Sequence, residues 1–203
     1  RKAQQVYYGM SKLARLYKIN KSKYFNIDSD LLFNSFDELP SSIILILYDD
    51  KSRTIYKFRI SDLINIINSA LSYAPKFFSE PQNIKNPYTN IEFTKAQLYT
   101  IYYNIKHSSY NLPILFHYFF LNNFDRLDFC KNCECYIREI VIDDFIINGS
   151  ITRKHKFILQ MLHEYKNIGI IIDSDFPKKT LVNTFNSYLK EYLNECYSFN
   201  TTL

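Results

Sequence analysis

Cys130, Cys133 and Cys135 are the residues of this sequence whose type and spacing most resemble those of metal ligands. A Cys-x-x-Cys pair commonly supplies two of the four ligands of tetrahedral zinc. A structural zinc site needs a second pair, and Cys196 alone is a poor partner. On a helix, Cys130 and Cys133 would share a face and Cys135 would point elsewhere. We therefore expect no cofactor, with a small zinc site at these three thiols as the alternative.

The other titratable side chains form no catalytic pattern. The four histidines are scattered, and His117 lies in an aromatic run that suits a core position. The carboxylate pairs Asp143–Asp144 and Asp173–Asp175 are explained by helix edges and caps. With only 3 glycines, the chain carries neither of the glycine-rich patterns that bind nucleotide phosphates. We therefore expect that the protein is not an enzyme.

Charge is concentrated at the N-terminal end of the chain. Residues 1–27 hold seven basic residues and no acidic one, whereas the rest of the chain holds 18 basic and 20 acidic residues. The seven basic residues are Arg1, Lys2, Lys12, Arg15, Lys18, Lys21 and Lys23. Such an arm attracts an acidic protein surface or phosphate. We expect it to dock on a partner protein. Nucleic-acid binding is the alternative, because the interleaved tyrosines Tyr7, Tyr8, Tyr17 and Tyr24 could stack on bases.

The composition predicts a globular protein. A chain of 203 residues with 47% hydrophobic and 17% aromatic residues can bury a sizeable core. Its strongest apolar run, residues 43–47, is far too short to cross a bilayer. We therefore expect no membrane span, and because no signal peptide is visible, we expect a protein that is not secreted.

The first half of the chain predicts an arm, a linker and a hairpin. Apolar residues recur with helical spacing over residues 4–17, and residues 18–41 read as a linker with one short turn near 29–36. Two strands are expected within residues 43–60, one on each side of an Asp-Asp-Lys-Ser turn. Ser61 and Asp62 are expected to cap a helix that follows. The predicted division is an arm and linker over 1–41 and a single globular domain over 42–203.

An irregular loop over residues 81–97 leads into a helix in the middle of the chain. Its end carries Thr94 and Gln97 at the spacing of a capping box. Its body is rich in prolines and in side chains that form local turns. We expect this loop to fix how the hairpin sits on the helices, through Pro81, Asn86, Pro87, Tyr88, Thr89 and Asn90.

The second half of the chain reads as mostly helical. Helices are expected over 94–107, 114–124, 125–147, 151–165 and 177–197, with Asn148-Gly149 closing the third. Residues 170–172 could form a short strand. The predicted fold is α+β, mainly α, with an N-terminal β-hairpin packed on a bundle of about five or six helices and preceded by a basic helical arm.

Two short motifs stand out, Tyr-x-Phe-x-Ile-x-x-Leu at 56–63 and Asn-Pro-Tyr-Thr-Asn at 86–90. Together with the high usage of Ile, Asn, Lys and Tyr, they resemble a family of uncharacterised proteins of nucleocytoplasmic large DNA viruses. The resemblance covers about residues 43–147 and carries no catalytic residues. It implies a virion component or assembly factor, with other viral proteins as partners, in the virion or in the viral factory of the host cytoplasm.

Two functions therefore remain open from the sequence. The first is a non-enzymatic structural or interaction protein, whose arm docks on a partner and whose many aromatic residues suit interfaces. The second is a nucleic-acid-binding protein that uses residues 1–27, with a zinc site at the cysteines as a further possibility.

Overall fold

The computed structural model describes residues 1–164, 172–173 and 175–197. These residues form seven α-helices and one three-stranded sheet, so the prediction of an α+β fold that is mainly α is confirmed. The chain divides into two compact units, Arg1–Ala70 with Asn83–Asp125 (unit 1) and Leu71–Gln82 with Arg126–Leu203 (unit 2). The expected single domain over 42–203 is thus divided between the two units, and the arm belongs to the unit that holds the hairpin.

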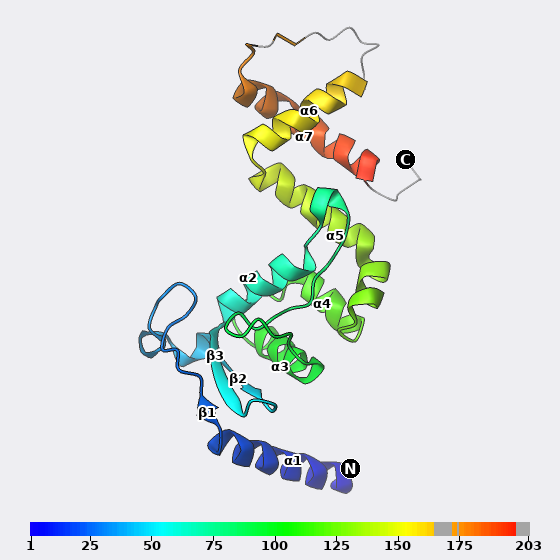
Figure 1. Cartoon of the computed structure of the whole chain (residues 1–203). Coiled ribbons are helices and arrows are strands. Elements are labelled where there is room, and N and C mark those ends of the chain that lie inside the picture. Colours follow the sequence, from blue (N-terminus) through cyan, green and yellow to red (C-terminus); the bar gives the residue numbers. More distant parts are fainter. Residues whose placement is uncertain (165–171, 174, 198–203) are drawn as a thin grey trace. The chain divides into compact units, whose positions relative to one another are not determined.

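Unit 1 begins with helix α1 (Lys2–Asn20), which leads into the short strand β1 (Lys23–Tyr24) (Figure 1). Strands β2 (Ile44–Asp49) and β3 (Thr54–Arg59) form the predicted hairpin. The sheet order is β1–β3–β2, with β1 parallel to β3 and β2 antiparallel to it. The parallel strand β1 lies in the region that the sequence predicts as a linker.

The hairpin forms because its strands have a buried apolar face and its turn satisfies its own polar groups. Leu45 and Leu47 of β2 are buried while Ile46 between them is exposed, as the two-residue period of a strand requires. In the turn, the carboxylate of Asp49 accepts hydrogen bonds from Lys51 N at 3.2 Å and from Ser52 Oγ at 2.6 Å. The turn chemistry and the strand pattern therefore specify the same register.

Three further α-helices begin in unit 1, namely α2 (Ile60–Leu71), α3 (Lys95–Lys106) and α4 (Ile114–Leu121). The capping box at the start of α3 is confirmed, with Thr94 Oγ1 accepting from Gln97 N at 3.3 Å and Gln97 Oε1 accepting from Thr94 N at 2.8 Å. Helix α2 follows β3 directly, so Ser61 and Asp62 lie in its first turn and do not precede it. Short 3₁₀ turns occupy Phe36–Glu38 and Ser41–Ile43.

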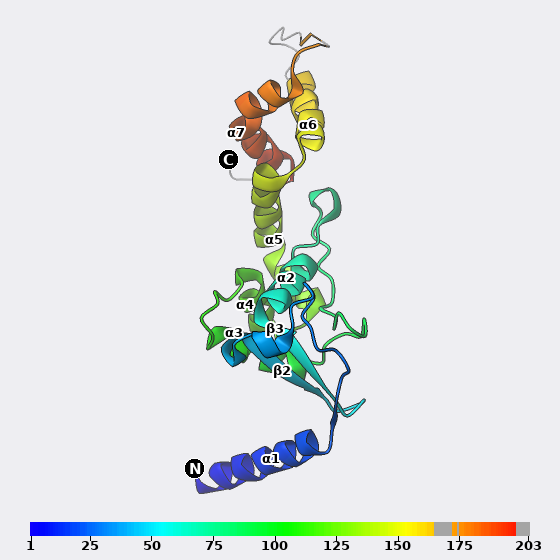
Figure 2. The same ribbon diagram turned by 90° about the vertical axis from the view of Figure 1, so that its left-hand side faces the viewer.

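Unit 2 consists of α5 (Arg126–Asn148), α6 (Ile151–Glu164), α7 (Lys178–Tyr197) and the 3₁₀ turn Pro75–Phe77. Helices α6 and α7 lie side by side in two perpendicular views (Figures 1 and 2). Their facing side chains form a common core with the end of α5. Its buried members are Phe77, Ile142, Phe145, Ile158, Met161, Leu162, Leu181, Val182, Leu189, Tyr192 and Leu193. The strand considered at 170–172 lies almost wholly outside the described residues.

Gly149 lies between α5 and α6, and the reason that this position requires glycine differs from the one that the sequence indicates. The residue does not adopt the left-handed conformation that usually makes glycine close a helix. Space is the constraint instead, since a Cβ at position 149 would lie 2.3 Å from the carbonyl oxygen of Phe145 and 2.7 Å from its ring. The junction is also held by Lys154, whose buried ammonium group donates to the carbonyl of Ile146 at 2.6 Å.

We predict that Gly149→Ala lowers the free energy of unfolding by about 1–3 kcal/mol, because the added methyl group overpacks the junction. The measurement is urea unfolding followed by circular dichroism. Gly9 of α1 is the matched control, since a Cβ there would meet no atom within 4 Å. Gly9→Ala should instead stabilise its helix by roughly 0.5–1 kcal/mol. Equal effects of the two substitutions would contradict the spatial explanation.

Candidate interaction surfaces

Helix α1 has no buried residue along its 19 positions. Val6, Met10, Leu13 and Tyr17 follow one another at alternating spacings of four and three residues, which places them on one face of a helix. Their exposed fractions are 60, 68, 68 and 66%. We call these four residues the α1 seam. Most of the stability of a protein helix comes from packing of its apolar face, and an exposed contiguous apolar face is typical of an interaction site.

The basic residues of the arm lie in and around α1. Arg1 precedes the helix, Lys21 follows it, and Lys23 begins β1; the other predicted residues, Lys2, Lys12, Arg15 and Lys18, lie within the helix. These side chains are exposed, as an electrostatic docking surface requires. The structure therefore brings the predicted basic residues onto one exposed segment of the protein.

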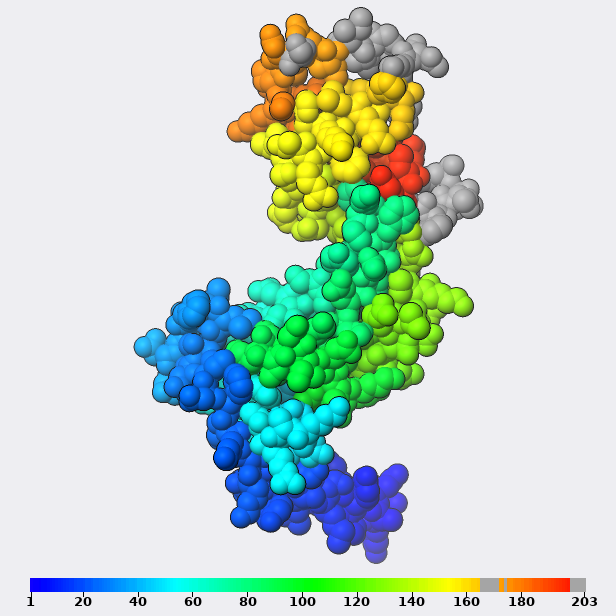
Figure 3. Space-filling view, viewed as in Figure 1, coloured from blue at the N-terminus to red at the C-terminus, as the bar shows by residue number. Residues whose placement is uncertain are grey.

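The hairpin turn neutralises part of this positive charge. Lys18 Nζ donates to Asp50 Oδ1 at 2.8 Å, and the two groups lie beside a groove of about 640 Å³ that Arg15 and Asp49 also line. In Figure 3 the dark blue helix lies beneath the cyan turn. The hydrogen bond and the charge of Asp50 raise the pKa of Lys18, and the bonds from Lys18 and Tyr48 lower the pKa of Asp50. A phosphate at this end of α1 would compete with these carboxylates.

The loop over residues 81–97 is tied to the sheet by Tyr88. Its ring stacks on Phe58 with centroids 5.2 Å apart and lies 6.2 Å from the ring of Tyr56, while its hydroxyl donates to the carbonyl of Lys57 at 3.2 Å. Burial, together with the negative charges of Asp62 and Asp30, raises the pKa of Tyr88 to about 12.

Asn86 holds the turn that presents Tyr88. The buried side chain accepts from Tyr88 N at 3.0 Å, and the Asn86 carbonyl accepts from Asn90 N at 2.8 Å. Asn90 has a φ of 56°, a left-handed conformation that asparagine tolerates. Thr89 Oγ1 accepts weakly from Ile91 N at 3.4 Å, while the ring of Pro87 is exposed. Pro81 is buried and lies in unit 2.

The cysteines are distributed around α5. Cys133 is buried, Cys135 is exposed, and Cys130 lies between these extremes, with its sulfur 3.9 Å from Ser79 Oγ. Within the described residues, no three His, Cys, Asp or Glu side chains form a group that could hold a metal ion. His117 is engaged elsewhere, since its Nδ1 lies 2.8 Å from the hydroxyl of Tyr102.

Two buried charged groups of unit 2, Arg138 and Lys154, and one exposed ion pair are used in structural contacts. Arg138 donates to the carbonyl of Tyr197 at 2.7 Å, pairs with Glu134 one turn away, and lies over the ring of Phe78. Lys154 closes the end of α5, as described above. On α7, Lys190 forms an ion pair with Asp143 at 2.7 Å. These arrangements fix helix ends and helix contacts.

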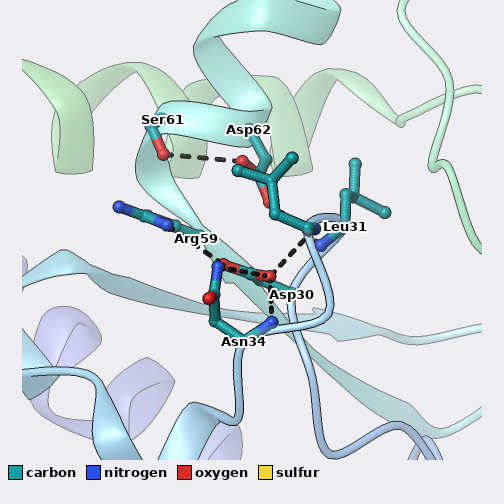
Figure 4. A network of polar contacts seen from close by, with 7 residues as sticks. Asp30, Leu31, Asn34, Arg59, Ser61 and Asp62 are labelled. Carbon is teal, nitrogen blue, oxygen red and sulfur yellow. Dashed lines mark hydrogen bonds and ion pairs between the residues drawn. The ribbon is translucent and has the colours of Figure 1, made fainter.

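A hydrogen-bonded loop over residues 28–36 is the feature that sequence reasoning missed. The sequence indicates only a turn in this region. The structure pairs Ser29 with Ser35 and surrounds the buried carboxylate of Asp30 with donors (Figure 4). Asp30 Oδ1 accepts from Leu32 N at 2.9 Å and from Asn34 N at 2.8 Å, and Oδ2 accepts from Arg59 Nη1 at 3.1 Å.

The same loop is also anchored to α2, because Asp62 Oδ2 accepts from Leu31 N at 3.2 Å. Burial alone would raise the pKa of Asp30, but the hydrogen bonds from Asn34, Arg59 and Leu32 outweigh it and hold that pKa below its ordinary value. The sequence signal that could have indicated this loop is an aspartate and an asparagine four residues apart around the apolar Leu31-Leu32-Phe33.

No helix of the described part of the chain is long and apolar enough to cross a membrane. Comparisons of the sequence and the structure with protein-family models, curated proteins and solved structures find no match.

We predict that Tyr88→Ala lowers the free energy of unfolding by about 2 kcal/mol, roughly half the cost of truncating a fully buried aromatic ring. Tyr88→Phe removes only the hydrogen bond to Lys57 and should cost about 0.5–1.5 kcal/mol. Urea unfolding of both variants tests the assignment. If self-association or partner binding changes while the unfolding curve of Tyr88→Ala does not, the loop is a contact surface and not a scaffold.

We also predict that the loop over 28–36 opens in acid. The pKa of Asp30 is lower in the folded protein than its ordinary value of 3.8. The ionised carboxylate therefore contributes its full stabilisation at a pH above 3.8, and this stabilisation is lost as the pH falls through the folded pKa. Amide hydrogen exchange at Leu32 and Asn34, followed by NMR, reports the opening. In an Asp30→Asn variant this acid-dependent step should be absent. A wild-type loop whose amides stay equally protected throughout the acid range would refute the prediction.

Proposed function

We propose that this protein is a non-enzymatic interaction protein that docks on a partner protein through α1. The observation that carries the proposal is that α1 has no buried residue and presents an apolar seam and exposed basic side chains on one segment. Burying the seam against a partner would supply the apolar contact that this helix lacks in the isolated chain. Its basic residues would select a partner with an acidic surface.

The resemblance of the motifs at 56–63 and 86–90 to proteins of nucleocytoplasmic large DNA viruses extends this proposal. On that basis the protein is a virion component or assembly factor, present in the virion or in the viral factory of the host cytoplasm, and its partners are viral proteins. Such a role requires positioned surfaces and no chemistry. The sheet, the Tyr88 loop and the Asp30 loop would then form a rigid body that carries α1.

Nucleic-acid binding through residues 1–27 is the competing function. Two features weigh against it. The ion pair between Lys18 and Asp50 engages one of the basic residues, and the ring of Tyr24 already has the ammonium group of Lys57 over it at 5.6 Å. Lys12 and Arg15 remain exposed for phosphate.

The test replaces Leu13 of the α1 seam with a photo-cross-linking amino acid in the full chain, within the particles or cells that contain it. We expect adducts that resist nuclease and disappear with protease. The same cross-linker in place of Ile147, an exposed apolar residue of unit 2, gives the background. Nuclease-sensitive adducts would overturn the proposal, and so would oligonucleotide binding that weakens steeply between about 50 and 200 mM salt.

A further inference from the structure

The tip of the Asp30 loop is an exposed apolar cluster. Leu31, Leu32 and Phe33 are consecutive, and Phe33 is 91% exposed, more than any other large apolar side chain of the described residues. Folding does not require a phenylalanine at such a position. Figure 3 shows this part of the chain as a lobe at the left edge of the view. We call these three residues the loop tip.

The backbone of the loop tip is tied by hydrogen bonds to the buried residues Asp30 and Asp62. The hydrogen bonds to Asp30 and Asp62 fix the amides of Leu31, Leu32 and Asn34, and Phe33 N donates to the carbonyl of Asp30 at 3.1 Å. Phe33 has a φ of 64°, a left-handed conformation that is strained for a bulky residue. A buried network thus maintains a strained, exposed phenylalanine. Such preorganisation lowers the entropic cost of binding through this side chain.

The charges beside the loop tip indicate the kind of surface that would cover it. Residues 28–38 contain Asp28, Asp37 and Glu38 with exposed side chains and no lysine or arginine. The fourth acidic residue of this segment, Asp30, is neutralised internally by Arg59. An anionic membrane or a nucleic acid would be repelled by this acidic surrounding. The complementary surface is apolar and basic.

Helix α1 has these two properties. Its seam is apolar and exposed, and its charged side chains are all basic. We infer that the loop tip of one copy of this chain docks on the α1 seam of a second copy. This inference rests on the proposed function and names the partner of α1 as another copy. The contact is heterologous, joining two different surfaces, so its repetition yields a ring or an open chain of copies.

The test uses the full chain and analytical ultracentrifugation over a range of concentrations. We expect reversible self-association of the wild type that weakens as salt is raised, because an acidic and a basic surface meet. The loop variant Leu32→Ser with Phe33→Gly should reduce association by roughly tenfold or more, since both apolar anchors are removed. Glycine also relieves the strain at the left-handed position, so this variant should unfold no more readily than the wild type.

The helix variant Met10→Ser with Leu13→Ser should lose self-association in the same way. Mixing the two variants is the decisive step, because the intact α1 of the loop variant can dock on the intact tip of the helix variant. The mixture should form one-to-one heterodimers that do not grow further. A loop variant that self-associates like the wild type would overturn the inference, as would a mixture without heterodimers.

A wild type that stays monomeric up to roughly 200 µM would also overturn self-docking, because the dissociation constant would then lie well above that concentration. This outcome is separable from a failure of the proposed function. If Leu13 cross-links to a different protein, α1 docking stands and only the identity of the partner is wrong. If Leu13 cross-links to nucleic acid, the proposed function fails whatever the ultracentrifuge shows.

Discussion

Unit 1 depends on hydrogen bonding and burial along β3. This strand pairs with β2 on one edge and with β1 on the other, and its side chains Tyr56 and Phe58 form the surface on which Tyr88 stacks. Its last residue, Arg59, supplies the cation that compensates the buried carboxylate of Asp30. An aspartate so placed could not remain ionised without such a partner and its hydrogen bonds. One strand therefore positions the arm, the central loop and the loop tip.

The elements that depend on local interactions could be predicted from the sequence. The capping box of Thr94 and Gln97 lies within four residues, and the β2–β3 hairpin joins neighbouring segments through a turn that Asp49 organises. The helices follow from the spacing of their apolar residues. In each case the residues that decide the structure are close together in the chain, so their pattern is visible without knowledge of the fold.

The remaining features depend on contacts between distant residues. Strand β1 has only two residues and pairs in parallel with a segment about thirty residues away, which no local pattern indicates. Asp30 and Arg59 are separated by a similar distance, so the ion pair that compensates this carboxylate cannot be read from the sequence, although the spacing of Asp30 and Asn34 indicates the local part of the network. The basic arm was recognisable by its charge alone. The pairing of Lys18 with Asp50 and the exposure of the seam required the structure.

The short pairing of β1 with β3 has a mechanical consequence. Helix α1 is attached to its unit through this edge strand, with Phe25 N donating to Ile55 O at 2.9 Å and the ring of Phe25 lying against Tyr56. A load applied to α1 would therefore enter the sheet along a parallel edge strand and stress that pairing before the antiparallel hairpin. The arm would detach while the hairpin and the loops of unit 1 stay folded, so the edge strand would act as the weakest attachment of α1 along this path.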